Sequence, residues 1–134
     1  MAARESMILL DTCTLLWLAS ETDRLSASAV AAISSNVNAL FVSSFSAFEI
    51  GIKSSKGKLK LSMPADEWFS TALRLHGLRE IPISGSIAAR STLLPLLHQD
   101  PADRILVATA LSHTLTIITP DHLIRQYPGV QTVW

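Results

Sequence analysis

Cysteine is almost absent from this sequence of 134 residues, which contains only Cys13. A single cysteine excludes an internal disulfide framework. Charge of one sign is also missing, because eleven basic side chains balance eleven acidic ones, so any nucleic-acid partner must be bound by a local basic patch. No apolar run approaches the roughly 20 residues of a membrane helix, and the start of the chain, with Arg4 and Glu5, does not resemble a signal peptide. We expect a soluble, cytoplasmic protein with one domain over residues 1–134 and no membrane partner.

Short apolar runs alternate with segments of helical character. The runs at 7–10, 40–43 and 115–119 lack polar alternation, which is typical of strands buried on both faces of a parallel sheet. This alternation predicts an α/β fold, a three-layer α/β/α sandwich with a mostly parallel central sheet. The predicted helices are 12–19, 27–35 with Ser26 as N-cap, 45–55, 64–76, 87–94 and 100–112, and the further strands are 78–83 and 131–134.

Four acidic residues are expected at one edge of that sheet. Asp11 ends the first predicted strand, and Asp121 follows the strand at 115–119. Glu49 and Asp103 lie near the starts of predicted helices. Parallel α/β sheets bind their ligands at the carboxyl ends of the strands, so the sequence predicts that these four carboxylates share one site.

The helical phase places two of these acids beside apolar side chains. At about 100° per residue, Glu49 lies about 40° from Phe45, which we expect to form a buried stripe with Phe48 and Ile52. Asp103 lies within about 60° of the apolar face of its own helix. Both carboxylates are therefore expected to point toward the protein interior rather than into bulk water.

Such a cluster needs a compensating positive charge. Two carboxylates ~5 Å apart repel by about 3 kcal/mol at an effective dielectric of ~20, so protons, buried arginines or a divalent cation must be present. Oxygen donors favour Mg²⁺ or Mn²⁺, as one or two ions, over zinc, because the histidines are scattered. The repulsion also predicts that Asp11→Asn leaves the melting temperature unchanged or raises it.

Each acid also has a purely structural explanation, which would be the better one if it stood alone. Together, however, these explanations require that chance place four acids at one sheet edge. The structural alternatives are an Asx turn at Asp11, a capping box of Ser46 with Glu49 or an ion pair of Glu49 with Lys53, a pairing of Asp103 with Arg104 or with the helix dipole, and a turn or cap at Asp121.

These residues, in this order, resemble the PIN domain, and most closely the VapC-like toxins of bacterial toxin–antitoxin pairs. The resemblance rests on residues 9–12 and 15–18, 43–53 around Glu49, 98–108, and 119–121. The run His-Gln-Asp-Pro-Ala-Asp-Arg at 98–104 is its most specific part. The resemblance implies a metal-dependent endoribonuclease that acts on RNA, is inhibited by a cognate antitoxin and forms a homodimer.

The resemblance also implies roles for individual residues. Asp11, Glu49, Asp103 and Asp121 match the acidic quartet, with Asp11 and Asp103 as the direct metal ligands and Glu49 and Asp121 binding a second ion, metal-bound water or the attacking hydroxide. Thr12 and Thr119 match hydroxyl positions that hydrogen-bond these acids, and Asp100 matches a supporting or capping position. Cys13 and Ala102 depart from the pattern, since close relatives often carry His and Phe there.

Basic residues concentrate after Glu49, where Lys53, Lys56, Lys58 and Lys60 are the candidates for contact with the RNA backbone. An ordinary solvated helix end is the alternative explanation of these lysines.

His98 lies near the acids, and we expect it to support them or to have a structural role. The main rival function is a non-catalytic PIN-like domain that binds RNA or protein, which predicts a missing or displaced acid.

Overall fold

The computed structural model describes residues 6–134 and contains a five-stranded, fully parallel sheet in the order β3-β2-β1-β4-β5. Arg4 and Glu5 lie outside the described residues. The central strand β1 pairs with β2 through Leu9 and Phe41 and with β4 through Leu9 and Ile117. The strands are β1 (Ile8–Leu10), β2 (Leu40–Ser43), β3 (Arg79–Ile81), β4 (Thr116–Ile118) and β5 (Gln131–Val133).

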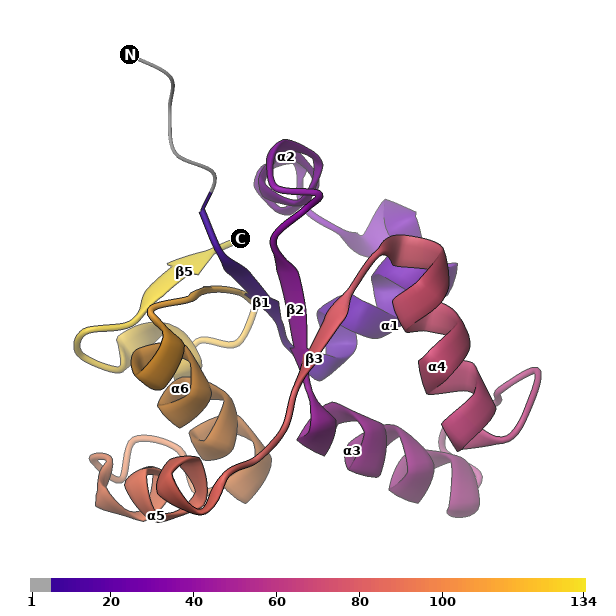
Figure 1. The fold of residues 1–134 in the computed structure, drawn as a ribbon. Helices are drawn as coiled ribbons and strands as arrows, with labels where there is room; N and C mark the ends of the chain where they lie inside the picture. The colour runs from indigo at the N-terminus through magenta and orange to yellow at the C-terminus, as the bar shows by residue number, and fades with distance from the viewer. Residues whose placement is uncertain (1–5) are drawn as a thin grey trace.

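Helices cover both faces of the sheet, which confirms the predicted three-layer α/β/α fold. Two separate hydrophobic clusters show the layers, because alternate residues of β1 enter different clusters: Ile8 and Leu10 pack with α1–α4, and Leu9 packs with α5 and α6 (Figure 1). The helices are α1 (Thr12–Ser20), α2 (Ala27–Ser35), α3 (Ser44–Ser55), α4 (Ala65–His76), α5 (Gly85–Leu93) and α6 (Pro101–His113), with short 3₁₀ turns at Thr22–Arg24 and Ile124–Gln126. Within residues 6–134, no helix is both long and apolar enough to span a bilayer.

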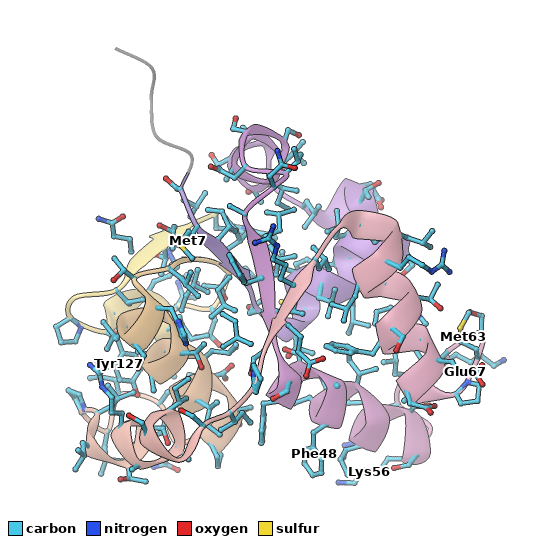
Figure 2. All side chains as sticks on the ribbon, in the orientation of Figure 1. Met7, Phe48, Lys56, Met63, Glu67 and Tyr127 are labelled. Carbon is cyan, nitrogen blue, oxygen red and sulfur yellow. The ribbon has the colours of Figure 1, made fainter. Side chains whose placement is uncertain are left out.

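The expected buried stripe of α3 is wrong. The buried residues of this helix are Ser46 and Ile50, whereas Phe48 is 60% exposed and Ile52 is 38% exposed, and Figure 2 shows Phe48 projecting from the ribbon on the side away from the sheet. α3 begins directly after β2, with the Ser43 hydroxyl accepting the N–H of Phe45. The packing of Ile50 into the core decides which face of α3 is buried, and periodicity alone cannot determine this because α3 has apolar residues on two faces.

Arg104 fixes the connection between α5 and α6. Its guanidinium is buried and donates to the Ser91 carbonyl from Nε (3.1 Å) and Nη2 (2.8 Å), and to the Leu94 carbonyl at 3.2 Å. These bonds satisfy carbonyl groups at the end of α5 that have no helical partner. The pairing of Arg104 with Asp103 that the sequence allowed is therefore not formed, and Arg104 instead anchors the segment that leads to His98.

We predict that Arg104→Met lowers the free energy of unfolding by about 1–3 kcal/mol, because the Ser91 and Leu94 carbonyls lose their donors while remaining near the interior. Urea unfolding followed by circular dichroism measures this loss. Arg90→Ala is the matched control, because Arg90 lies on the exposed side of α5 and bonds only the Ser112 hydroxyl. An Arg104 variant as stable as the control would contradict the anchoring role.

Candidate active site

The four predicted acids line one cavity of about 260 Å³. Asp11 follows β1 directly, Asp121 follows β4 after two residues, and Glu49 and Asp103 lie within the first two turns of α3 and α6. The parallel order of the sheet brings the ends of β1 and β4 side by side, and α3 and α6 contact each other next to them. Thr12, Cys13, Lys53, Asp100 and Pro120 complete the lining.

Asp11 is 5% exposed and caps α1. Its Oδ1 accepts the Thr14 N–H at 2.8 Å, and its Oδ2 accepts the Thr119 hydroxyl at 2.5 Å. The Cys13 thiol lies 3.3 Å from Oδ1. The Asx-type turn is thus present, yet the same carboxylate faces the cavity, so the structural and the functional explanations of Asp11 do not exclude each other.

Glu49 is held from α1 rather than by a capping box. The Thr12 hydroxyl lies 2.5 Å from Glu49 Oε1 and 2.9 Å from the Ser46 hydroxyl, and the charged carboxylate is the stronger acceptor for its single proton. Ser43, not Ser46, caps α3, so the capping-box alternative is wrong. Burial raises the pKa of Glu49. The Thr12 hydrogen bond and the charge of Lys53 lower it, but they offset this increase only in part.

Asp121 uses its two carboxylate oxygens for different purposes. Oδ1 accepts the N–H groups of Leu123 and Ile124 at 2.8 and 2.9 Å, which is the expected cap of a turn. Oδ2 faces the cavity and lies 3.3 Å from Nε2 of His98. The Thr119 hydroxyl, which donates to Asp11, also accepts the N–H of Asp121 at 3.1 Å. One threonine therefore positions two of the four acids.

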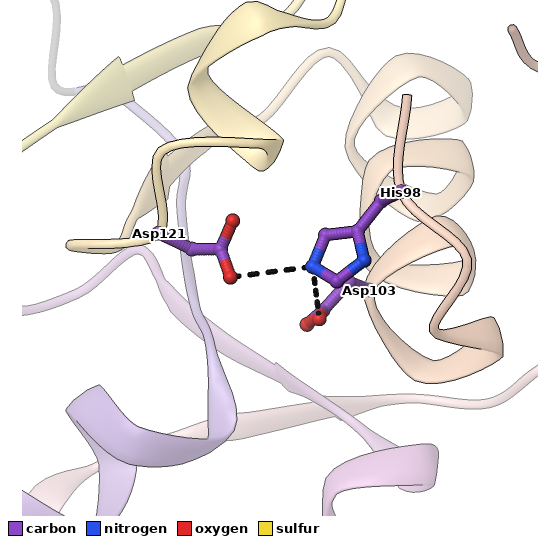
Figure 3. Close-up of side chains that lie close together, drawn as sticks. All are labelled: His98, Asp103 and Asp121. Carbon is purple, nitrogen blue, oxygen red and sulfur yellow. Dashed lines mark hydrogen bonds and ion pairs between the residues drawn. The ribbon is translucent and has the colours of Figure 1, made fainter. Parts of the chain in front are cut away.

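His98 joins Asp103 and Asp121. Its Nε2 lies 2.8 Å from Asp103 Oδ2 and 3.3 Å from Asp121 Oδ2 (Figure 3). Its Nδ1 accepts the N–H of Asp100 at 3.2 Å, so the proton of a neutral ring lies on Nε2, which donates to both carboxylates. The His98 N–H donates to the Tyr127 hydroxyl at 3.0 Å, which holds the loop in place.

The sequence interpretation had not counted His98 among the main site residues. The run at 98–104 was the available signal, but its local pattern does not say which way the loop before α6 turns. Hydrogen bonds from Arg104 to Leu94 and from His98 to Tyr127 supply that direction, and they join residues that are 10 and 29 positions apart in the sequence. Asp100 caps α6 through the Ala102 N–H at 3.0 Å, as expected, and also lines the cavity.

Residues 8–130 match the PIN domain family. The chain belongs to this family. It is 34% identical over 130 residues to "Ribonuclease VapC22" of Mycobacterium tuberculosis (strain ATCC 25618 / H37Rv), with 95% of this chain and 98% of the relative covered. A toxin–antitoxin complex from Klebsiella pneumoniae is 26% identical, with a TM-score of 0.63 and coverage of 92% and 94%. DNA-bound VapBC from Salmonella typhimurium, at 15% identity, supports the fold alone, with a TM-score of 0.68 and coverage of 95% and 96%.

The surroundings of Asp103 and Asp121 shift the pKa values of these two acids in opposite directions. Burial and then the charge of Asp100 raise the pKa of Asp103 to about 7, although His98 acts in the opposite direction. For Asp121, partial burial acts to raise the pKa, but the N–H of Ile124 and the contact with His98 outweigh it and lower the pKa. Burial and the charge of Asp11 raise the pKa of the Cys13 thiol to about 12, so this thiol stays protonated at neutral pH.

The side chains that line the cavity suit a hard divalent cation such as Mg²⁺ or Mn²⁺. The carboxylates of five acidic residues and one ammonium group, that of Lys53, line the cavity, so its net charge is negative and its donors are the hard oxygens of Mg²⁺ or Mn²⁺ sites. Among residues 6–134, only His98, Asp103 and Asp121 have donor atoms that all lie within 4.8 Å of one another. Asp103 and Asp121 thus meet at His98, while Asp11 lines the same cavity, and the expected role of Asp11 and Asp103 as direct metal ligands stays a prediction.

The four lysines are all exposed but are not equivalent. Lys53 lies on α3 and lines the cavity. Lys56 caps the end of α3, and Lys58 and Lys60 follow in the connection to α4. Lys53 therefore lies beside the acids, whereas the other three lysines follow it along the chain and do not line the cavity.

The effect of carboxylate repulsion on thermal stability is best tested at Asp103. Asp11 is less suitable because it also caps α1, so that replacing it changes the cap as well as the charge. The pKa of Asp103 lies near 7 in the folded protein against 3.8 ordinarily, so the folded state binds its proton more tightly. The free energy of unfolding therefore falls as pH rises from about 4 to about 7. We predict that Asp103→Asn melts higher than the wild type at pH 8 in EDTA, and that Mn²⁺ raises the wild-type melting temperature but not that of the variant.

Thermal melts at pH 5 and pH 8, with and without MnCl₂, test this prediction. Asp66→Asn is the control, since Asp66 is exposed in the first turn of α4 and does not line the cavity. If Asp103→Asn melts below the wild type at pH 8, or keeps the full response to Mn²⁺, the electrostatic description of the site is wrong.

Proposed function

We propose that this PIN domain is a Mg²⁺- or Mn²⁺-dependent endoribonuclease that hydrolyses RNA phosphodiester bonds, and that it is the toxin of a toxin–antitoxin pair. One observation carries the proposal: Asp11, Glu49, Asp103 and Asp121 line the same cavity at the sheet edge, although they are dispersed over the whole chain. The relative named as a ribonuclease covers almost the full length of the chain and supports the same activity.

The protein's own groups prepare the site for a cation and a phosphate. Asp103 and Asp121 would hold the ion with Asp11, and Glu49 would orient the water that attacks phosphorus. A divalent cation bound there polarises the phosphate and lowers the pKa of a coordinated water. Thr119 and Thr12 hold the carboxylates of Asp11 and Glu49 in position by hydrogen bonds, which is the pre-organisation that electrostatic catalysis requires.

His98 acts as a substitute for positive charge between Asp103 and Asp121. Its Nε2–H donates to oxygens that a cation would also use. The raised pKa of Asp103 also reduces the negative charge of the site, because burial and the nearby carboxylates favour the neutral, protonated form of this side chain. Binding of a divalent cation therefore competes with a proton and a hydrogen bond, and we expect the apparent metal affinity to rise with pH up to about 7.

The partners follow from the relatives. A solved structure similar to this chain is a toxin–antitoxin complex, and we propose a cognate antitoxin that binds exposed apolar surface around the early helices, such as Val30 on α2 and Val37 in the turn after it. We also propose a homodimer, and action in the cytoplasm, where RNA is available. A non-catalytic binding domain is less well supported, since that alternative predicts a missing or displaced acid and all four are in the cavity.

Cleavage of a pool of single-stranded RNA tests the activity. We predict cleavage with Mg²⁺ or Mn²⁺ and none in EDTA, and a loss of about 100-fold or more for Asp103→Asn and Glu49→Gln. Asp66→Asn is again the control and should cleave like the wild type. Equal cleavage in EDTA, or full activity of Asp103→Asn, would contradict the proposed metal-dependent mechanism.

The lysines make a separate prediction about RNA affinity. Lys53→Gln should weaken binding of single-stranded RNA and reduce the slope of log affinity against log salt by about 0.7, the value for one lost phosphate contact. Lys60→Gln, which changes the same charge away from the cavity lining, should have a smaller effect. Fluorescence anisotropy at several salt concentrations measures both, and equal slopes for the two variants would argue against a specific position for Lys53.

A further inference from the structure

A second hollow, of about 250 Å³, lies next to the acid cavity on the outer side of α3. Its apolar lining comes from Phe45, Phe48 and Ile52 of α3 and from Pro101 and Ala102 at the start of α6. It is smaller than the roughly 300–1,000 Å³ typical of pockets for drug-sized molecules. Its size therefore suits one flat group rather than a folded segment of a partner.

The two hollows are neighbours. Glu49, Lys53 and Asp100 line both of them, so a ligand in one lies directly beside a ligand in the other. When the acid cavity holds a scissile phosphate, the chemical group nearest to it is the nucleoside attached to that phosphate. The apolar hollow is thus close enough to the acid cavity to receive the base of a flanking nucleotide, and Lys53 belongs to the lining that the two hollows share.

The aromatic surface in this hollow is pre-arranged. Phe48 is 60% exposed, and its ring lies 5.5 Å from that of Phe45 at an angle of 44°, a geometry typical of favourable aromatic pairs. Ser46 and Ile50 form the buried side of α3, so packing of the helix on the sheet does not require Phe48. Lys56 projects on the same side of α3 as Phe48 in Figure 2, which adds positive charge along this surface.

We propose that this hollow is a base-binding subsite, in which the ring of Phe48 stacks on the base of a nucleotide next to the scissile phosphate and Ile52 and Pro101 border it. The proposal rests on the proposed ribonuclease function and deepens it. Stacking needs an unpaired base with an accessible face, so the substrate is RNA that is single-stranded at the cut. Stacking alone is tolerant of base identity, so the subsite selects for an unstacked base more than for one sequence.

The experiment uses RNA in which one base is removed. Cut sites of the wild type are mapped in a randomised RNA pool with Mn²⁺, and an oligonucleotide with one mapped site is prepared intact, with an abasic 5′ nucleotide, and with an abasic 3′ nucleotide. We expect one abasic form to lower kcat/KM of the wild type by about 10-fold. Phe48→Ala should lower kcat/KM on intact RNA by a similar factor, and the same abasic change should then cause no further loss.

Two further variants separate stacking from apolar contact. Phe48→Leu keeps an apolar side chain without a flat ring and should behave like Phe48→Ala, whereas Phe48→Trp should retain wild-type cleavage. Leu75→Ala, at a position 66% exposed on α4, is the control for loss of an exposed apolar side chain and should change nothing. Melting curves check that the Phe48 variants are folded, as the exposure of this residue leads us to expect.

Three results would overturn the subsite. The first is equal cleavage of intact and abasic RNA by the wild type. The second is an unchanged ratio of intact to abasic cleavage in Phe48→Ala. The third is a lower mass of Phe48→Ala than of the wild type in sedimentation, which would make this face an interface between copies of the chain. A wild type that cleaves no RNA in the pool would refute the proposed function and the subsite with it, whereas the other results leave the ribonuclease assignment intact.

Discussion

Repulsion among carboxylates in a shared, partly buried cavity is the constraint on which the rest of this structure depends. Several acidic side chains meet where β1 and β4 end, with Lys53 as the one ammonium group in the lining among residues 6–134. Such a site is stable only if each charge is hydrogen-bonded, protonated or paired. The structure uses the first two solutions: hydrogen bonds for Asp11 and Asp121, and a raised pKa of about 7 for Asp103.

The surrounding elements are arranged to hold these charges in place. Thr119 connects Asp11 to Asp121, and Thr12 reaches from α1 to Glu49 on α3. Arg104 anchors the loop before α6, and Tyr127 receives the backbone N–H of His98. A rigid frame of this kind keeps negative oxygens together without a cation, which is what pre-organisation for a metal and a phosphate requires.

Exposure on one helix links this site to the choice of substrate. α3 carries Glu49 toward the acids, Ile50 toward the core and Phe48 toward solvent. Successive residues of a helix point about 100° apart, so three adjacent positions face the acid cavity, the core and solvent, and we propose catalysis for Glu49 and base recognition for Phe48. The proposed base subsite follows from this division, since the helix that supplies a carboxylate to the phosphate also presents an aromatic ring beside it.

Much of the fold and part of the site could be predicted from the sequence. Apolar runs without alternation and caps such as Ser26 are local signals, and they predicted the strands, the helices and a mostly parallel sheet, but not the order of its strands. The location of Asp11 and Asp121 after strands was also local, because parallel strands end at one edge. Three features that depend on the packing of one element against another could not be predicted from the sequence. They are the rotation of α3 that exposes Phe48, the turn of the loop that brings His98 to Asp103, and the binding of Arg104 to the Ser91 carbonyl rather than to Asp103. Periodicity and spacing fix which residues share an element, whereas the packing of one element on another decides which way each side chain faces.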